Sequence, residues 1–211
     1  MLNKNWLAAF TASFVLGVSA ASAANTTLTE PTDDAMCLLY YKLAKLAPPL
    51  DDFAAHASSV QRANEFDKQH SLEAEKGRLI ALQASLLPVT TVTIALQMNF
   101  GEYDSTAGEY DLSGFDPSQF VIFECFGQGQ VRLRFDNASD AQRWMLDSKA
   151  AEAVLTKDPD RTILAQATVD LSDVDATGPD EPPMMVGIVR EVTVTRQFFN
   201  TPLGHYLVAT N

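Results

Sequence analysis

The pattern of apolar and polar positions changes near Pro88. After this residue apolar side chains recur at every second position, most clearly in 89–100, where alternate residues are Val, Ile, Leu, Met and Phe. Further strands are expected at 120–126, 131–135, 162–171, 184–195 and 205–210. Gly127-Gln128-Gly129 predicts that the first two of these form a hairpin.

The stretch 24–87 instead has the three- and four-residue spacing of helices. Thr32-Asp33-Asp34 supplies N-cap oxygens for a helix that extends to about residue 47, where Pro48-Pro49 stops it. Asp51-Asp52 begins a second helical region that extends to about residue 87, with a possible break at Gly77. Its expected packing face is narrow and contains mostly small residues, namely Ala63, Phe66, His70, Ala74, Gly77, Ala81 and Ala84. This face packs on the chain's own domain or serves a partner.

One more helix is expected after the hairpin. Ser139 and Gln142 form a capping box. The apolar face of this helix is Ala141, Trp144, Met145, Ser148 and Leu155. Because most strands follow one another without crossover helices, the expected fold class is α+β, with an N-terminal helical segment packed on a mainly antiparallel sheet. Residues 24–87 and 88–211 are expected to form one compact domain.

The first 23 residues have the three parts of a cleavable secretory signal peptide. Lys4 gives a positive start, residues 6–18 are apolar and uncharged, and Ala21-Ser22-Ala23 is an A-x-A cleavage site. The apolar run is shorter than the roughly 20 residues that span a bilayer, which disfavours an uncleaved anchor. We expect cleavage near Ala23/Ala24 and a soluble mature chain, periplasmic or secreted, without a transmembrane anchor.

Composition adds an acidic surface to this picture. The 211 residues include 27 Asp and Glu against 15 Lys and Arg, and the formal net charge of −12 becomes about −13 when Lys4 is removed. Such a surface repels phosphate backbones, so nucleic acid is not an expected partner. Cationic partners or divalent metal ions are compatible with it, as is a simple contribution to solubility.

Two cysteines, Cys37 and Cys125, remain after the expected cleavage. An oxidising compartment favours their pairing. A bridge across so long a loop stabilises a fold by about 4–5 kcal/mol in the chain-entropy account. The alternative is two separate buried thiols. We predict the disulfide Cys37–Cys125.

A short duplication is the most unusual local feature. Gly101-Glu102-Tyr103-Asp104 is followed seven residues later by Gly108-Glu109-Tyr110-Asp111, and Asp116 lies just beyond. If the copies pair across a turn, like charges meet, which is unfavourable unless a cation, a basic partner or water offsets it. Calcium suits clustered carboxylates, and a ring beside a carboxylate suits a sugar or a cationic peptide. The candidate ligand- or partner-binding residues are Glu102, Tyr103, Asp104, Glu109, Tyr110 and Asp111. The competing interpretation is a solvated hairpin end.

A second acidic segment, residues 173–178, begins like a calcium-binding loop. Asp173 and Asp175 alternate and Gly178 follows, but the twelfth position is Met184 and not the bidentate Glu of such loops. The favoured interpretation is an acidic turn, with Asp173 and Asp175 as weak metal candidates.

No catalytic signature accompanies these acidic groups. The sequence contains no GxSxG, SxxK, HExxH, Walker or dinucleotide-binding pattern, and its three histidines lack metal-ligand spacing. Cys125 has no basic neighbour that would activate a nucleophilic thiol. We expect an exported, non-catalytic protein that binds an unidentified protein or small molecule in the envelope, without a cofactor. The alternative is a carboxylate- or calcium-dependent hydrolase acting on envelope polysaccharide or peptide.

Overall fold

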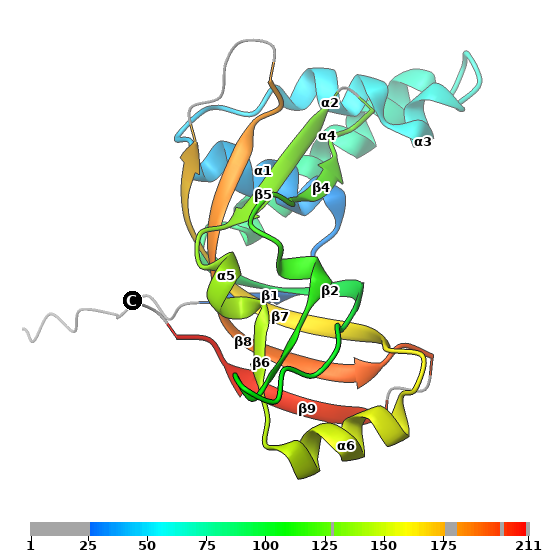
Figure 1. Ribbon diagram of the computed structural model, residues 1–211. Helices are drawn as coiled ribbons and strands as arrows, with labels where there is room; N and C mark the ends of the chain where they lie inside the picture. Colours follow the sequence, from blue (N-terminus) through cyan, green and yellow to red (C-terminus); the bar gives the residue numbers. More distant parts are fainter. Residues whose placement is uncertain (1–25, 128, 176–180, 199–200, 210–211) are drawn as a thin grey trace, which may run out of the picture.

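A curved sheet of seven strands forms the centre of the molecule (Figure 1). The computed structural model describes residues 26–127, 129–175, 181–198 and 201–209. The strands are β1 (Thr26–Thr29), β2 (Val89–Asn99), β4 (Val121–Glu124), β5 (Gln130–Phe135), β7 (Thr162–Asp175), β8 (Met184–Arg196) and β9 (Pro202–Leu207). Their order is β1-β2-β7-β8-β5-β4, and β9 also pairs with β8. The pairs β1–β2 and β5–β8 are parallel and the others antiparallel, so the predicted α+β class is confirmed.

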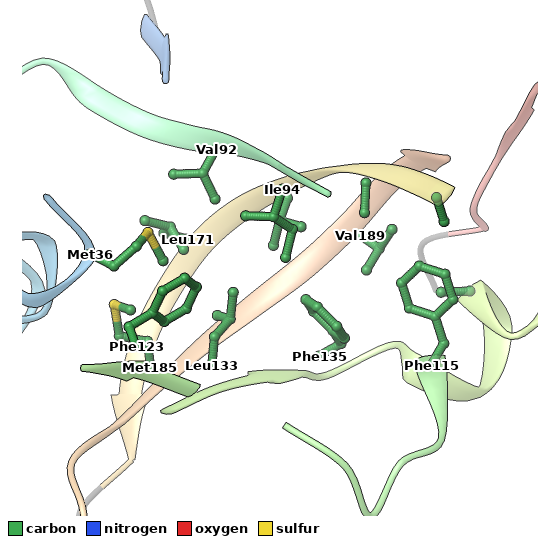
Figure 2. Close-up of a cluster of buried hydrophobic side chains, with 14 of the residues drawn as sticks. Met36, Val92, Ile94, Phe115, Phe123, Leu133, Phe135, Leu171, Met185 and Val189 are labelled. Atoms are coloured by element: carbon green, nitrogen blue, oxygen red, sulfur yellow. The ribbon is translucent and has the colours of Figure 1, made fainter. Parts of the chain in front are cut away.

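The sheet bends around the hydrophobic core. Figure 2 shows Val92 and Ile94 of β2 pointing toward Phe123 of β4 and Phe135 of β5, with β7 and β8 behind them. Alternate residues of β2 and β7 supply this face, as the period of two requires, and Ile94 pairs with the equally buried Ala167. Strands β2 and β4 thereby face each other across the core.

Helices α1 (Asp33–Leu43), α2 (Leu50–His56), α3 (Ser58–Gln61) and α4 (Lys68–Ser85) lie beside β4 and β5 at one end of the molecule (Figure 1). Thr32 caps α1 as predicted, because its hydroxyl oxygen accepts from the Ala35 N–H at 3.3 Å. The Lys42 ammonium donates to the carbonyl oxygens of Val89 and, at 3.1 Å, of Leu86. This cation therefore joins the end of α1 to the end of α4. Among the described residues, no helix is long and apolar enough to cross a membrane.

The predicted disulfide Cys37–Cys125 is confirmed. It joins the buried side of α1 to the residue that follows β4, with the two Cα atoms 5.7 Å apart and the cysteines 88 positions apart in the sequence. The helical end and the sheet are thereby covalently connected.

The second helical region is broken and buries a different face from the predicted one. Residues 62–67 form turns, in which the Asn64 side chain accepts from the N–H groups of Phe66 and Asp67. Helix α4 turns Leu79 to the interior. The residues predicted to pack, including Phe66 with 94% of its surface exposed, lie outside. Exposed members of that set are Phe66, His70, Ala74, Gly77, Ala81 and Ala84.

The single helix predicted after Ser139 is wrong. The chain forms α5 (Ala138–Ala141), then β6 (Arg143–Met145), then α6 (Ser148–Lys157), whose Asp147 cap accepts from the Ala150 N–H at 2.7 Å. Strand β6 pairs with β3 (Glu109–Asp111) in a second, two-stranded sheet. Trp144 of β6 is buried against Gly204, where an added Cβ would approach the indole to 2.7 Å. Burial of this ring overrides the local helical pattern.

Candidate functional site

The two copies of the duplicated tetrapeptide run antiparallel, as predicted. Asp104 and Glu109 exchange backbone hydrogen bonds of 2.9 and 3.2 Å, and the Gly101 N–H donates to the Asp111 carbonyl at 2.8 Å. The second copy includes β3, whose other edge pairs with β6. The repeat therefore folds as one hairpin against the small sheet.

The tyrosines of this hairpin point inward. Tyr110 is 1% exposed and donates its hydroxyl to the Ala151 carbonyl at 3.0 Å. Tyr103 donates to the Leu146 carbonyl at 2.8 Å, and the two rings meet edge to face at 5.3 Å. Both hydroxyls thus satisfy backbone acceptors of the chain itself.

Several carboxylates of the hairpin also have partners in the chain. Glu109 forms an ion pair with Arg143 at 2.8 Å. Asp104 accepts from the N–H groups of Ala107 and Thr106, which lowers the pKa of its carboxyl. Glu102 and Asp111 are exposed. The ion pair and these hydrogen bonds offset the repulsion between the hairpin carboxylates without a ligand. A binding role for the hairpin residues stays a prediction.

A pocket of about 330 Å³ beside the hairpin includes Asp111 and Asp116 in its lining. Asp116 accepts hydrogen bonds from the hydroxyl and the N–H of Ser118, and these lower the pKa of its carboxyl. A glycosidase needs a general acid whose pKa is raised. The shift at Asp116 is in the opposite direction, so this pocket gives the hydrolase hypothesis no support.

The second acidic segment begins at the end of β7. Asp175 forms an ion pair with Arg134 at 3.1 Å, and Asp173 accepts from the N–H of Val174 at 2.8 Å. The remainder of the predicted calcium loop, residues 176–178, lies outside the described residues. In the part of the chain that the structure covers, no three His, Cys, Asp or Glu side chains are grouped to hold a metal ion.

A pocket of about 590 Å³ lies at the helical end of the molecule. It is enclosed by α1, α2, the β4–β5 hairpin and the segment that leads into β8. Its lining residues are Tyr40, Tyr41, Pro49, Phe53, Glu124, Cys125, Gly129, Gln130, Val131, Glu181, Pro182 and Pro183. Because Cys125 is one of them, the disulfide fixes the hairpin wall relative to α1. We call this cavity the aromatic pocket.

One wall of the aromatic pocket is a chain of rings. Tyr40 meets Tyr41 at 5.5 Å, and Tyr41 meets Phe53 at 5.7 Å, both edge to face. Phe53 is buried and stacks on Phe126 at 4.1 Å, which holds the wall in place. Burial raises the pKa of Tyr41, so this hydroxyl stays neutral near pH 7. Neither tyrosine hydroxyl hydrogen-bonds to any residue that the structure describes, which leaves both available to a ligand.

The charged groups of the aromatic pocket are acidic. Glu124 and Glu181 are in its lining, together with the amide of Gln130, and no Lys, Arg or His is among the lining residues that the structure describes. Glu124 is held in place because its Oε1 accepts from Gln130 Nε2 at 3.0 Å, while its N–H donates to Asp33 at 3.3 Å. Rings beside carboxylates form a site for a cation with apolar surface.

Sequence reasoning did not find this pocket. Its residues come from four separate segments, so no local motif contains them. The available signals were the adjacent Tyr40-Tyr41 on a helix and the pairs Pro48-Pro49 and Pro182-Pro183, which stiffen opposite walls. Comparisons of the chain with family models, curated proteins and solved structures found no match.

Proposed function

We propose that this chain is an exported, non-catalytic binding protein whose aromatic pocket holds a cationic ligand. The observation that carries the proposal is the lining itself, in which the rings of Tyr41 and Phe53 lie beside the carboxylates of Glu124 and Glu181. Aromatic faces and carboxylates both attract a positive charge, and the rings also cover apolar surface. The formal net charge of −12 favours the approach of cations.

The proposed location outside the cytoplasm depends on the leader-like segment 1–23. The disulfide agrees with it, because such bonds persist in oxidising compartments. The periplasm is the proposed compartment, with a small organic cation or a basic side chain of an envelope protein as the ligand class.

Thermal unfolding with simple cations tests the proposal. We expect spermidine and tetramethylammonium to raise the melting temperature in a saturable manner. Glucose at the same concentration should leave the melting temperature unchanged. Ligand at a hundredfold excess over its dissociation constant adds about 2.7 kcal/mol to the stability of a protein that binds it only when folded.

A matched pair of variants locates the effect. Glu124→Gln removes a pocket carboxylate, whereas Glu152→Gln makes the same chemical change on an exposed residue of α6. We expect the first variant to abolish the cation-dependent shift and the second to retain it. Equal shifts in the two variants would show general charge screening and overturn the proposal.

A further inference from the structure

The edge of β2 is covered by another strand over only part of its length. Strand β1 pairs with β2 as far as Thr93, whose carbonyl accepts from the Glu30 N–H at 2.8 Å. The peptide groups of alternate strand residues point to the same side. Ala95 and Gln97 therefore direct their N–H and C=O groups to this edge beyond the end of β1. Neither has a backbone partner there in the part of the chain described.

Strand β4, at the opposite end of the sheet, also has outward peptide groups without backbone partners among the described residues. The Cys125 N–H donates to Gly129 across the hairpin, so Ile122 and Glu124 direct their peptide groups outward. The Glu124 N–H is capped by Asp33. Ile122 has no such cap among the described residues, and its side chain is exposed. Strands β2 and β4 therefore both present backbone groups that have no partner among the described residues.

A groove lies between these two strands. Two adjoining pockets, of about 340 and 230 Å³, share Leu96 of β2 and Val121 of β4 in their linings. Phe123 and Phe135 also line the groove, and Figure 2 shows both directed toward β2 from the opposite side of the core.

Leu96 shows that the core is incomplete along this groove. It lies on the inward face of β2, two positions from each of Ile94 and Met98. Those neighbours are buried, whereas Leu96 and Val121 are only half-buried. An inserted apolar side chain would cover both of the half-buried residues.

We propose that this groove binds an extended segment of a partner protein, which adds a strand between β2 and β4. A strand is the occupant that satisfies the peptide groups of Ala95, Gln97 and Ile122 while placing alternate side chains against Leu96. The uncovered part of β2 accommodates about five residues at the usual rise per residue.

The charge of Glu30 indicates what kind of segment the groove binds. Glu30 lines one end of the groove and makes no ion pair with a described residue, so the inserted segment carries a basic residue there. A second copy of this chain is disfavoured as the donor, because each copy has a formal net charge of −12. The groove thus fits an extended, alternating apolar peptide with a basic end.

Selection from a phage-displayed random heptapeptide library, followed by amide NMR with the tightest peptide, tests this proposal. We expect enrichment of sequences that alternate apolar residues and carry a basic residue at one end. On binding, the amide signals of Ala95, Gln97 and Ile122 should shift and become protected from exchange. Failure to enrich such sequences, or shifts confined to other residues, would overturn the inference.

Two substitutions at one position sharpen the test. Ala95→Pro removes the outward N–H, which the β2–β7 ladder does not use, and Ala95→Ser keeps it. We expect Ala95→Pro to weaken the peptide's affinity by about tenfold, from the lost hydrogen bond and the added ring, and Ala95→Ser to leave it unchanged. Equal affinities would contradict the proposal. The amide shifts are measured on the unaltered chain, so they decide the matter even if the proline variant is unstable.

Discussion

Two regions of the molecule combine tyrosines with carboxylates, and they use them differently. In the duplicated hairpin, Tyr103 and Tyr110 turn inward and donate their hydroxyls to backbone carbonyls. In the aromatic pocket, Tyr40 and Tyr41 line an open cavity, and their hydroxyls have no partner among the described residues. The composition of the two regions is alike. What separates a structural group from a candidate site is whether its polar atoms are already satisfied.

The difference comes from the elements that carry the tyrosines. Tyr110 lies on β3 directly opposite Trp144 of β6, so its ring completes the core of the small sheet. Tyr40 and Tyr41 follow the buried run 35–39 in the second half of α1, where the helix surface meets the pocket. Three predictions test this contrast, beginning with the largest expected effect.

Removal of the disulfide should destabilise the molecule most. The variant Cys37→Ser with Cys125→Ser frees a loop that now closes over 88 positions, and we expect unfolding free energy to fall by about 4–5 kcal/mol. Urea denaturation measures this change. Trp144 is buried in the hairpin region, so its fluorescence reports unfolding there. A loss below about 1 kcal/mol would show that α1 is held mainly by packing.

Deletion of single hydroxyls compares the two regions directly. Tyr110→Phe leaves the Ala151 carbonyl without its side-chain donor, and we expect a cost of about 1–2 kcal/mol in unfolding free energy. Tyr40→Phe removes a hydroxyl at the pocket surface, and we expect a change near zero. Parallel urea titrations of both variants measure the pair. Equal costs would remove the distinction drawn between the two regions.

The smallest effect concerns pH and Asp158, at the end of α6. Asp158 is 1% exposed, and this burial raises the pKa of its carboxyl. The charge of Arg196, at 3.6 Å, opposes the rise, and the charge of Asp160 adds to it. A carboxyl with a raised pKa binds more protons in the folded state than in the unfolded state. The contribution of Asp158 to stability therefore falls as pH rises from the ordinary pKa of the carboxyl, in the unfolded chain, through the raised pKa in the folded chain.

Asp158→Asn should remove this loss, so that unfolding free energy declines less between pH 4 and pH 7 than in the unaltered chain. Asp104 provides a control of opposite sign, because the pKa of its carboxyl is lowered. Asp104 therefore adds stability above the ordinary pKa of an Asp carboxyl, and this contribution is lost as pH falls below that pKa. Denaturation at pH 4 and pH 7 measures the slope due to Asp158, whereas the loss due to Asp104 is measured below the ordinary pKa of its carboxyl. An unchanged slope in Asp158→Asn would contradict the burial argument.

The sequence predicted the features that depend on local pattern. The period of two located β2, β7 and β8, the glycines located the β4–β5 hairpin, and Thr32 marked the start of α1. The disulfide followed from the number of cysteines and the expected compartment. Each of these signals lies within one short segment or depends on composition alone.

What the sequence did not predict depends on distant contacts. The three-residue spacing of Ala141 and Trp144 is typical of a helix. The segment is extended because Trp144 packs against Tyr110 and Gly204, which are distant in the sequence. The parallel pairing of β5 with β8 joins strands that about fifty residues separate. The aromatic pocket and the groove are also formed by such contacts, so no local pattern contains them.

The position of β8 in the chain has a consequence for the timing of folding. This strand pairs with β5, β7 and β9, yet it begins only at Met184. Before it is synthesised, the emerging polypeptide holds two separate pieces, β1-β2-β7 and β4-β5, with no strand to join them. Pairing between such distant segments is slow, and the complete seven-stranded sheet cannot form before β8 is available. Completion of the sheet thus depends on a strand that is synthesised late, at residues 184–196.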